Sequence, residues 1–121
     1  MTWVKKQYLD KSAIIELYSG NNDSVINRFH RSACNLYTTL FELSELSELT
    51  IYDCHVSTLR IEVVPNLQII TAILNDNKIF GPNSASILIT ASRECAAIAR
   101  LSSIRTWNCV DDIELPEWVN P

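Results

Sequence analysis

Between residues 24 and 43, apolar side chains recur at intervals of three and four, which is the spacing of one face of an α-helix. The turn-prone segment GNNDS comes directly before this run, and Asp23 or Ser24 can cap the first turn. A second run with helical spacing follows Pro82. We therefore predict two long helices, at about 24–43 and 83–102.

Two shorter patterns lie closer to the ends of the chain. The stretch DKSAIIELY predicts a helix over residues 10–18, with Asp10 or Ser12 as its cap and Gly20 as its stop. Residues 104–110 are compatible with a short final strand. The prolines and acidic residues beyond it favour irregular structure.

The middle of the chain, after residue 48, is rich in β-branched and aromatic residues, which favours strands. Leu59, Ile61 and Val63 alternate with polar residues, as in a strand with one solvated face. The stretch NLQIITAIL is apolar at both alternating positions, which is typical of a strand covered on both faces. We predict that this stretch is the most buried strand.

Together these elements predict a single compact α+β domain over residues 1–121. Its sheet would have three or four strands, from about 48–75 and possibly 104–110, and two long helices would pack on it. Hydrophobic residues make up 47% of the chain and charged residues 20%, which excludes a disordered protein. The N-terminus has no apolar signal core and no stretch is long enough to span a bilayer, so we expect a cytoplasmic protein with no membrane partner. Its four scattered cysteines are then expected to be reduced.

One stretch suggests an alternative fold. Residues 46–56 match the template L-x-x-L-x-L-x-x-N/C-x-L, and residues 69–79 match it again less well. The chain therefore resembles the leucine-rich-repeat family over residues 46–79. The resemblance implies short strands with leucines pointing into the core, and an α/β solenoid whose surface binds other proteins.

Acidic residues are concentrated in two segments, and the formal net charge is −4. Residues 42–62 hold five acidic residues against Arg60, and residues 106–121 hold four acidic residues and no basic one. This distribution argues against nucleic acid as a partner and favours a basic protein. Trp118 adds an apolar anchor to the second segment. The predicted partner-binding residues are Glu42, Glu45, Glu48, Asp111, Asp112, Glu114, Glu117 and Trp118.

Candidate chemistry is sparse. Cys54 and His55 are types of residue found in nucleophilic sites, but neighbours on a strand point to opposite faces, so we expect them to be apart. His30 and Cys34 are four residues apart on a predicted helix and can share a metal ion, yet no further ligand pair accompanies them. The chain has no glycine-rich phosphate loop. We therefore expect no catalytic residue, no metal and no cofactor.

These patterns predict a non-catalytic protein-binding protein. The most concrete form of the hypothesis is an acidic inhibitor or immunity-type protein that neutralises a basic partner, such as a nuclease toxin. Two alternatives stay open. One is an interaction module of the leucine-rich-repeat type, and the other is a small enzyme or ligand-binding domain that uses Cys54 and His55.

Overall fold

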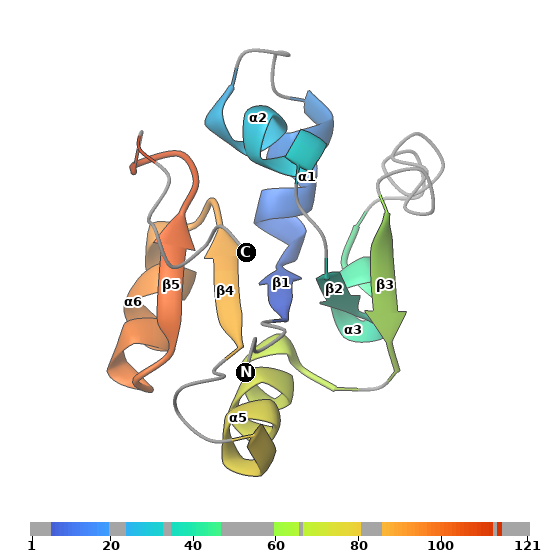
Figure 1. Ribbon diagram of the computed structural model, residues 1–121, viewed down its shortest axis with the longest axis vertical. Coiled ribbons are helices and arrows are strands. Elements are labelled where there is room, and N and C mark those ends of the chain that lie inside the picture. The colour runs from blue at the N-terminus through green and yellow to red at the C-terminus, as the bar shows by residue number, and fades with distance from the viewer. Residues whose placement is uncertain are drawn as a thin grey trace.

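The computed structural model describes residues 6–19, 24–32, 35–46, 60–65, 67–80, 86–112 and 114. Within these ranges, five strands form one sheet, and each neighbouring pair is parallel. The strands are β1 (Gln7–Leu9), β2 (Leu36–Thr39), β3 (Ile61–Val64), β4 (Ile87–Thr90) and β5 (Arg105–Asn108). Their order across the sheet is β3-β2-β1-β4-β5, so β1 lies at the centre (Figure 1).

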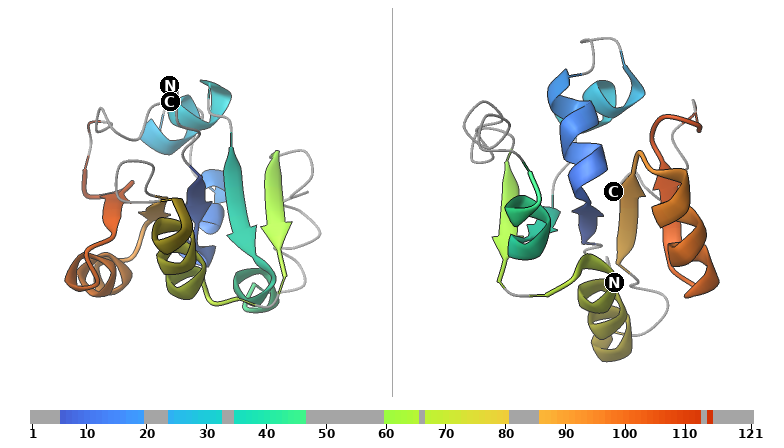
Figure 2. Two further views of the ribbon diagram at one scale, coloured as in Figure 1. Left: turned by 60° about the horizontal axis from the view of Figure 1, so that its bottom comes forward. Right: turned by 180° about the vertical axis from the view of Figure 1, so that it is seen from behind.

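Helices cover both faces of this sheet. They are α1 (Lys11–Ser19), α2 (Val25–Ser32), α3 (Leu40–Ser44), α5 (Ile69–Phe80) and α6 (Arg93–Leu101). In the left panel of Figure 2, α1 and α2 lie on one side of the sheet and α5 and α6 on the other. The chain winds from β1 outward to β3 and then crosses to β4 and β5, which makes this a doubly wound α/β domain.

The core has one apolar layer on each side of the sheet. Under α1 and α2, the rings of Phe29 and Trp107 meet edge to face with their centroids 5.4 Å apart. Under α5 and α6, Ile73 and Ala99 pack with Leu88. The neighbouring residues of β4 are fully buried because the strand is covered on both faces.

The structure corrects the predicted α+β class to α/β and shows where the two long helices were wrong. The helix predicted at 24–43 ends at Ser32, and residues 36–39 form β2. Asn35, with φ of 60°, takes the left-handed conformation between them. The helix predicted at 83–102 likewise contains β4, and α6 begins only at Arg93.

The strand predicted in NLQIITAIL is also wrong, because α5 begins at Ile69. Ile69, Ala72 and Ile73 are buried, and their spacing of three and four fits a helix. The second repeat match, at 69–79, therefore lies in a helix and not in a strand.

The helix predicted at 10–18 is present as α1, and β3 and β5 lie within predicted strand regions. Most of the first repeat match lies outside the described residues. No helix in the described part of the chain is long and apolar enough to cross a membrane.

Candidate functional site

Two acidic residues follow neighbouring strands at the carboxyl edge of the sheet. Asp10 comes directly after β1, and Glu42 lies in the first turn of α3, which follows β2. The direction of winding reverses between β1 and β4, and in such sheets ligands bind outside the carboxyl ends of the strands at that point. The two carboxylates therefore lie at the position where this fold most often holds a site.

Asp10 joins β1, α1 and β4. Its Oδ1 accepts hydrogen bonds from Ser12 Oγ at 2.6 Å and from the Ala13 amide at 2.9 Å, so it caps α1. Its Oδ2 accepts a hydrogen bond from Thr90 Oγ1. Asp10 is only 2% exposed, and these donors replace the water that a buried carboxylate would lose. The carboxylate is thereby held in one orientation.

The Ser12 and Thr90 hydroxyls lie 3.1 Å from each other and both contact Asp10. Each donates to Asp10, and each accepts from the backbone of the β4–α6 connection: Ala91 N to Ser12 Oγ at 2.9 Å, and Ser92 N to Thr90 Oγ1 at 3.0 Å. Neither Ser12 nor Thr90 is among the residues that line the cleft, so their hydroxyls support Asp10 from behind it.

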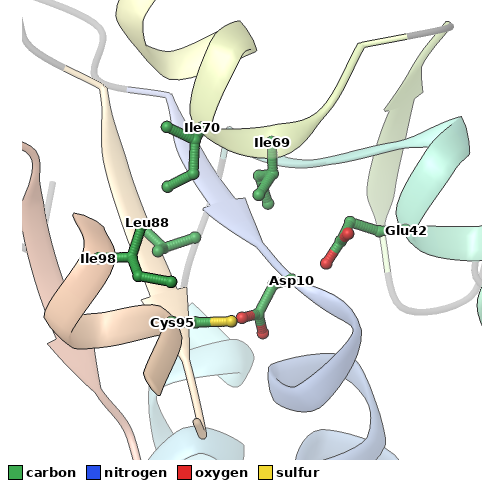
Figure 3. A pocket seen from close by; sticks show the side chains of 7 residues that line it. All are labelled: Asp10, Glu42, Ile69, Ile70, Leu88, Cys95 and Ile98. Carbon is green, nitrogen blue, oxygen red and sulfur yellow. The ribbon is translucent and has the colours of Figure 1, made fainter. Parts of the chain in front are cut away.

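Glu42 points into the cleft at this edge (Figure 3). Thr39 caps α3 by accepting from the Glu42 amide at 3.2 Å, and Glu42 Oε1 accepts from the Lys11 amide at 2.9 Å. No described residue donates to Oε2, although the residue is only 8% exposed. Burial, together with the charges of Asp10 and Glu45, raises the pKa of Glu42, whereas the Lys11 amide and charge act in the opposite direction.

The cleft has a volume of about 120 Å³. At roughly 30 Å³ per water, this is room for about four water molecules or one small group, well below the size of a drug-like ligand site. Its lining contains two carboxylates, those of Asp10 and Glu42, and no basic side chain. The lining residues are Asp10, Glu42, Ile69, Ile70, Leu88, Cys95 and Ile98.

Cys95, in the first turn of α6, places its sulfur beside the Asp10 carboxylate (Figure 3). Cys95 is an exposed residue, but partial desolvation of its thiol raises the pKa, the charges of Asp10 and Glu42 raise it further, and a hydrogen bond with Ser92 acts in the opposite direction. The thiol is therefore protonated at neutral pH and a poor nucleophile. Among the described residues, no group of three or more His, Cys, Asp or Glu side chains is placed to hold a metal ion.

The predicted partner-binding residues separate into four groups. Glu42 is buried in the cleft, whereas Glu45 and Glu114 are exposed. Asp111 and Asp112 follow β5 at the same edge, where they pair with Arg93 at 2.7 Å and Arg100 at 3.7 Å. Glu45 pairs with Lys11 at 2.8 Å. Glu48, Glu117 and Trp118 lie outside the described residues, as do Cys34, Cys54 and His55.

Two cleft residues, Asp10 and Cys95, were not predicted as site residues. Asp10 was predicted only as a helix cap, a role that it does have. The signal in the sequence was weak, because only two apolar residues, Tyr8 and Leu9, come directly before Asp10, and the lysines and glutamine before them do not resemble a buried parallel strand. Cys95 carries no such signal, because it reaches the cleft only through the packing of α6.

The fold and the cleft define a small doubly wound α/β protein with two buried carboxylates at its switch point. Comparison with known protein families, with curated proteins and with solved structures gives no match for this chain. Its function must therefore be argued from the geometry of the cleft.

Proposed function

We propose that the cleft binds a divalent cation together with a phosphate ester, and that the protein hydrolyses this ester. One observation carries the proposal: two buried carboxylates, Asp10 and Glu42, line one cleft that has no basic side chain in its lining. Asp10 has its hydrogen-bond donors, but Glu42 Oε2 has none among the described residues, so a ligand with positive charge would be stabilised there.

A divalent cation such as Mg²⁺ fits this requirement. Mg²⁺ is commonly held by one or two carboxylates, with water and substrate phosphate oxygens completing its coordination. Glu42 Oε2 accepts no hydrogen bond from a described residue and is available as a ligand. The volume of about 120 Å³ suits a partly hydrated ion, and the rest of an ester would lie outside on the surface.

Attack by water is the reaction that these residues favour. Neither Ser12 nor Thr90 lines the cleft, and the pKa of the Cys95 thiol is raised, so the lining offers no activated hydroxyl or thiol. A bound divalent cation lowers the pKa of its water and neutralises charge on a phosphate. The rigidly held Asp10 would orient that cation from one side.

Calorimetric titration with MgCl₂ and MnCl₂ tests the cation site. We expect Glu42→Gln to weaken binding by about tenfold or more, because a neutral amide replaces the free carboxylate. Glu45→Gln is the matched control and should change the affinity by less than about threefold, since Glu45 is exposed and outside the cleft. Hydrolysis of bis(4-nitrophenyl) phosphate with Mn²⁺ should fall in Glu42→Gln alone. Absence of cation binding by the native protein, or equal hydrolysis by all three proteins, would overturn the proposal.

We keep the acidic inhibitor or immunity-type protein as a second proposal. The observation that favours it is that three acidic residues are at least partly exposed: Glu45 at the end of α3, and Asp112 and Glu114 after β5. The test is the association rate with a basic partner such as a nuclease as the salt concentration rises. A rate that neither salt nor neutralisation of Asp111, Asp112, Glu114 and Glu117 changes would rule out a charge-driven complex.

A further inference from the structure

Half of the cleft has no role in the function proposed above. Opposite the carboxylates, four aliphatic side chains line it: Ile69 and Ile70 of α5, Leu88 of β4 and Ile98 of α6 (Figure 3). A hydrated divalent cation gains nothing from such walls, because its partners are oxygen atoms. Ile98 is 55% exposed, so this apolar surface is open to a ligand that enters from solvent.

We infer that the cleft also takes a primary alkylammonium group, with its nitrogen between Asp10 and Glu42 and its carbon chain against Ile70, Leu88 and Ile98. This goes beyond the proposed function, because it assigns a second class of ligand to the same carboxylates. An ammonium group has three donors and no acceptor, and Glu42 Oε2 is an acceptor that no described residue uses. The alkyl stem would cover apolar surface while the charge meets the carboxylates.

The size of the cleft and the geometry of Asp10 favour an ammonium over a guanidinium group. A guanidinium group binds best to both oxygens of one carboxylate, and both oxygens of Asp10 already accept hydrogen bonds. An ammonium group is a compact point charge and needs only single acceptors. Two sources share this chemistry: a free aliphatic amine, and a lysine side chain of another protein.

The first experiment is a calorimetric series of straight-chain amines from methylamine to hexylamine at neutral pH. Each buried methylene contributes about 0.8 kcal/mol, so the affinity should rise about fourfold per carbon until the chain extends past Ile98. The alcohols of the same lengths are the control and should bind weakly at every length. Equal affinity of amines and alcohols, or no rise with chain length, would overturn the inference.

Two variants separate the charged end of the cleft from its apolar wall. Glu42→Gln should weaken binding of pentylamine by about tenfold or more. Ile98→Ser should instead reduce the rise in amine affinity with chain length. The matched control Leu101→Ser should leave that rise unchanged, because Leu101 is 86% exposed and does not line the cleft. If both Glu42→Gln and Ile98→Ser bind the amines with the same affinities as the native protein, the amine binds elsewhere and the inference is contradicted.

Competition with Mn²⁺ distinguishes this inference from the proposed function. Pentylamine should displace Mn²⁺ from the native protein, and Ile98→Ser should keep its Mn²⁺ affinity while losing the preference for long amines. Amine binding without any Mn²⁺ binding would leave the inference standing and overturn only the proposed function. Comparison of cadaverine with Nα-acetyl-lysine amide and with a short lysine peptide then identifies the source: tighter binding of cadaverine indicates a free amine, and tighter binding of the peptide indicates a protein partner.

Discussion

Thr90 and Asp10, which lie 80 residues apart in the sequence, are joined by a hydrogen bond from Thr90 Oγ1 to Asp10 Oδ2 where β4 and β1 end. Both residues are buried, and the same hydroxyl accepts the Ser92 amide at 3.0 Å. The pair therefore fixes the two central strands to each other and sets the start of α6, whose first turn carries Cys95. The shape of the cleft depends on this contact.

We predict that Thr90→Val destabilises the protein by about 1–3 kcal/mol. The substitution keeps the shape of the side chain but leaves Asp10 Oδ2 and the Ser92 amide without their partner. Unfolding in urea, followed by tryptophan fluorescence, measures the loss. Thr71→Val is the control, because Thr71 is exposed on α5 and should change the free energy of unfolding by less than about 0.5 kcal/mol. A loss in Thr90→Val no larger than in this control would contradict the role given to Thr90.

Glu42 should make the stability of the protein depend on pH. Burial, Asp10 and Glu45 raise its pKa above the ordinary value of 4.5, so the folded state holds its proton more tightly than the unfolded state does. A raised pKa contributes stability that is fully present below pH 4.5 and is lost as the pH rises through the folded value. The free energy of unfolding of the native protein should therefore fall, relative to that of Glu42→Gln, as the pH rises from 4.5 towards 7.

Urea unfolding of the native protein and of Glu42→Gln at several pH values in this range measures the difference. Glu45→Gln is the control, because Glu45 is exposed and pairs with Lys11 at the surface, and its difference from the native protein should stay nearly constant. Parallel curves for the native protein and Glu42→Gln would show that burial of Glu42 does not raise its pKa.

The elements that were predicted correctly are those in which the spacing of apolar residues and the capping residues indicate the same structure that the burial pattern shows. In α1, Asp10 caps the first turn, and Ile14 and Leu17 are buried, so cap and periodicity point to the same helix. Residues 36–39 were wrongly predicted as helix because Leu36 and Tyr37 continue the apolar spacing of three and four that begins in α2. The two threonines after them favour a strand, and that preference is the one the structure follows.

Central strands of a parallel sheet are hard to predict because both faces are buried. Ile87, Leu88 and Ile89 are all apolar, and a run of this length cannot be distinguished from a helix segment by period alone. For the same reason, the apolar residues at the start of α5, which form a helix, were predicted to be a buried strand. Once β2 and β4 were assigned to helices, the parallel order was lost, and the acidic residues that follow the strands could not be placed on one edge.

We predict that Cys95 reacts slowly with iodoacetamide at pH 7.5, at a rate below that of free cysteine. Burial and the charges of Asp10 and Glu42 raise the pKa of its thiol, so the reactive thiolate is scarce. Removal of one negative charge in Glu42→Gln should speed the reaction, whereas Glu45→Gln should not. Trypsin releases Cys95 in the peptide ECAAIAR, residues 94–100, so mass spectrometry reads this cysteine alone. Fast alkylation in the native protein would instead support a functional thiolate.

In the middle of the central strand, the buried Tyr8 anchors α5. Its hydroxyl donates to Asp76 Oδ2 at 2.7 Å, and Ser86 Oγ donates to the same oxygen at 3.1 Å. A hydrogen bond to a charged acceptor contributes about 1.5–3 kcal/mol, so Tyr8→Phe should destabilise the protein by roughly that amount. Because α5 carries Ile69 and Ile70 to the cleft, the substitution should loosen one apolar wall as well.

Hydrogen exchange followed by mass spectrometry tests this local effect. In Tyr8→Phe, the amides of α5 should exchange faster than in the native protein, while those of α1, on the other face of the sheet, should change little. Tyr37→Phe is the matched control: the Tyr37 ring lies 5.7 Å from that of Tyr8, but its hydroxyl makes no hydrogen bond with a described residue. Equal exchange of α5 in both variants would show that the contact between Tyr8 and Asp76 does not hold this helix.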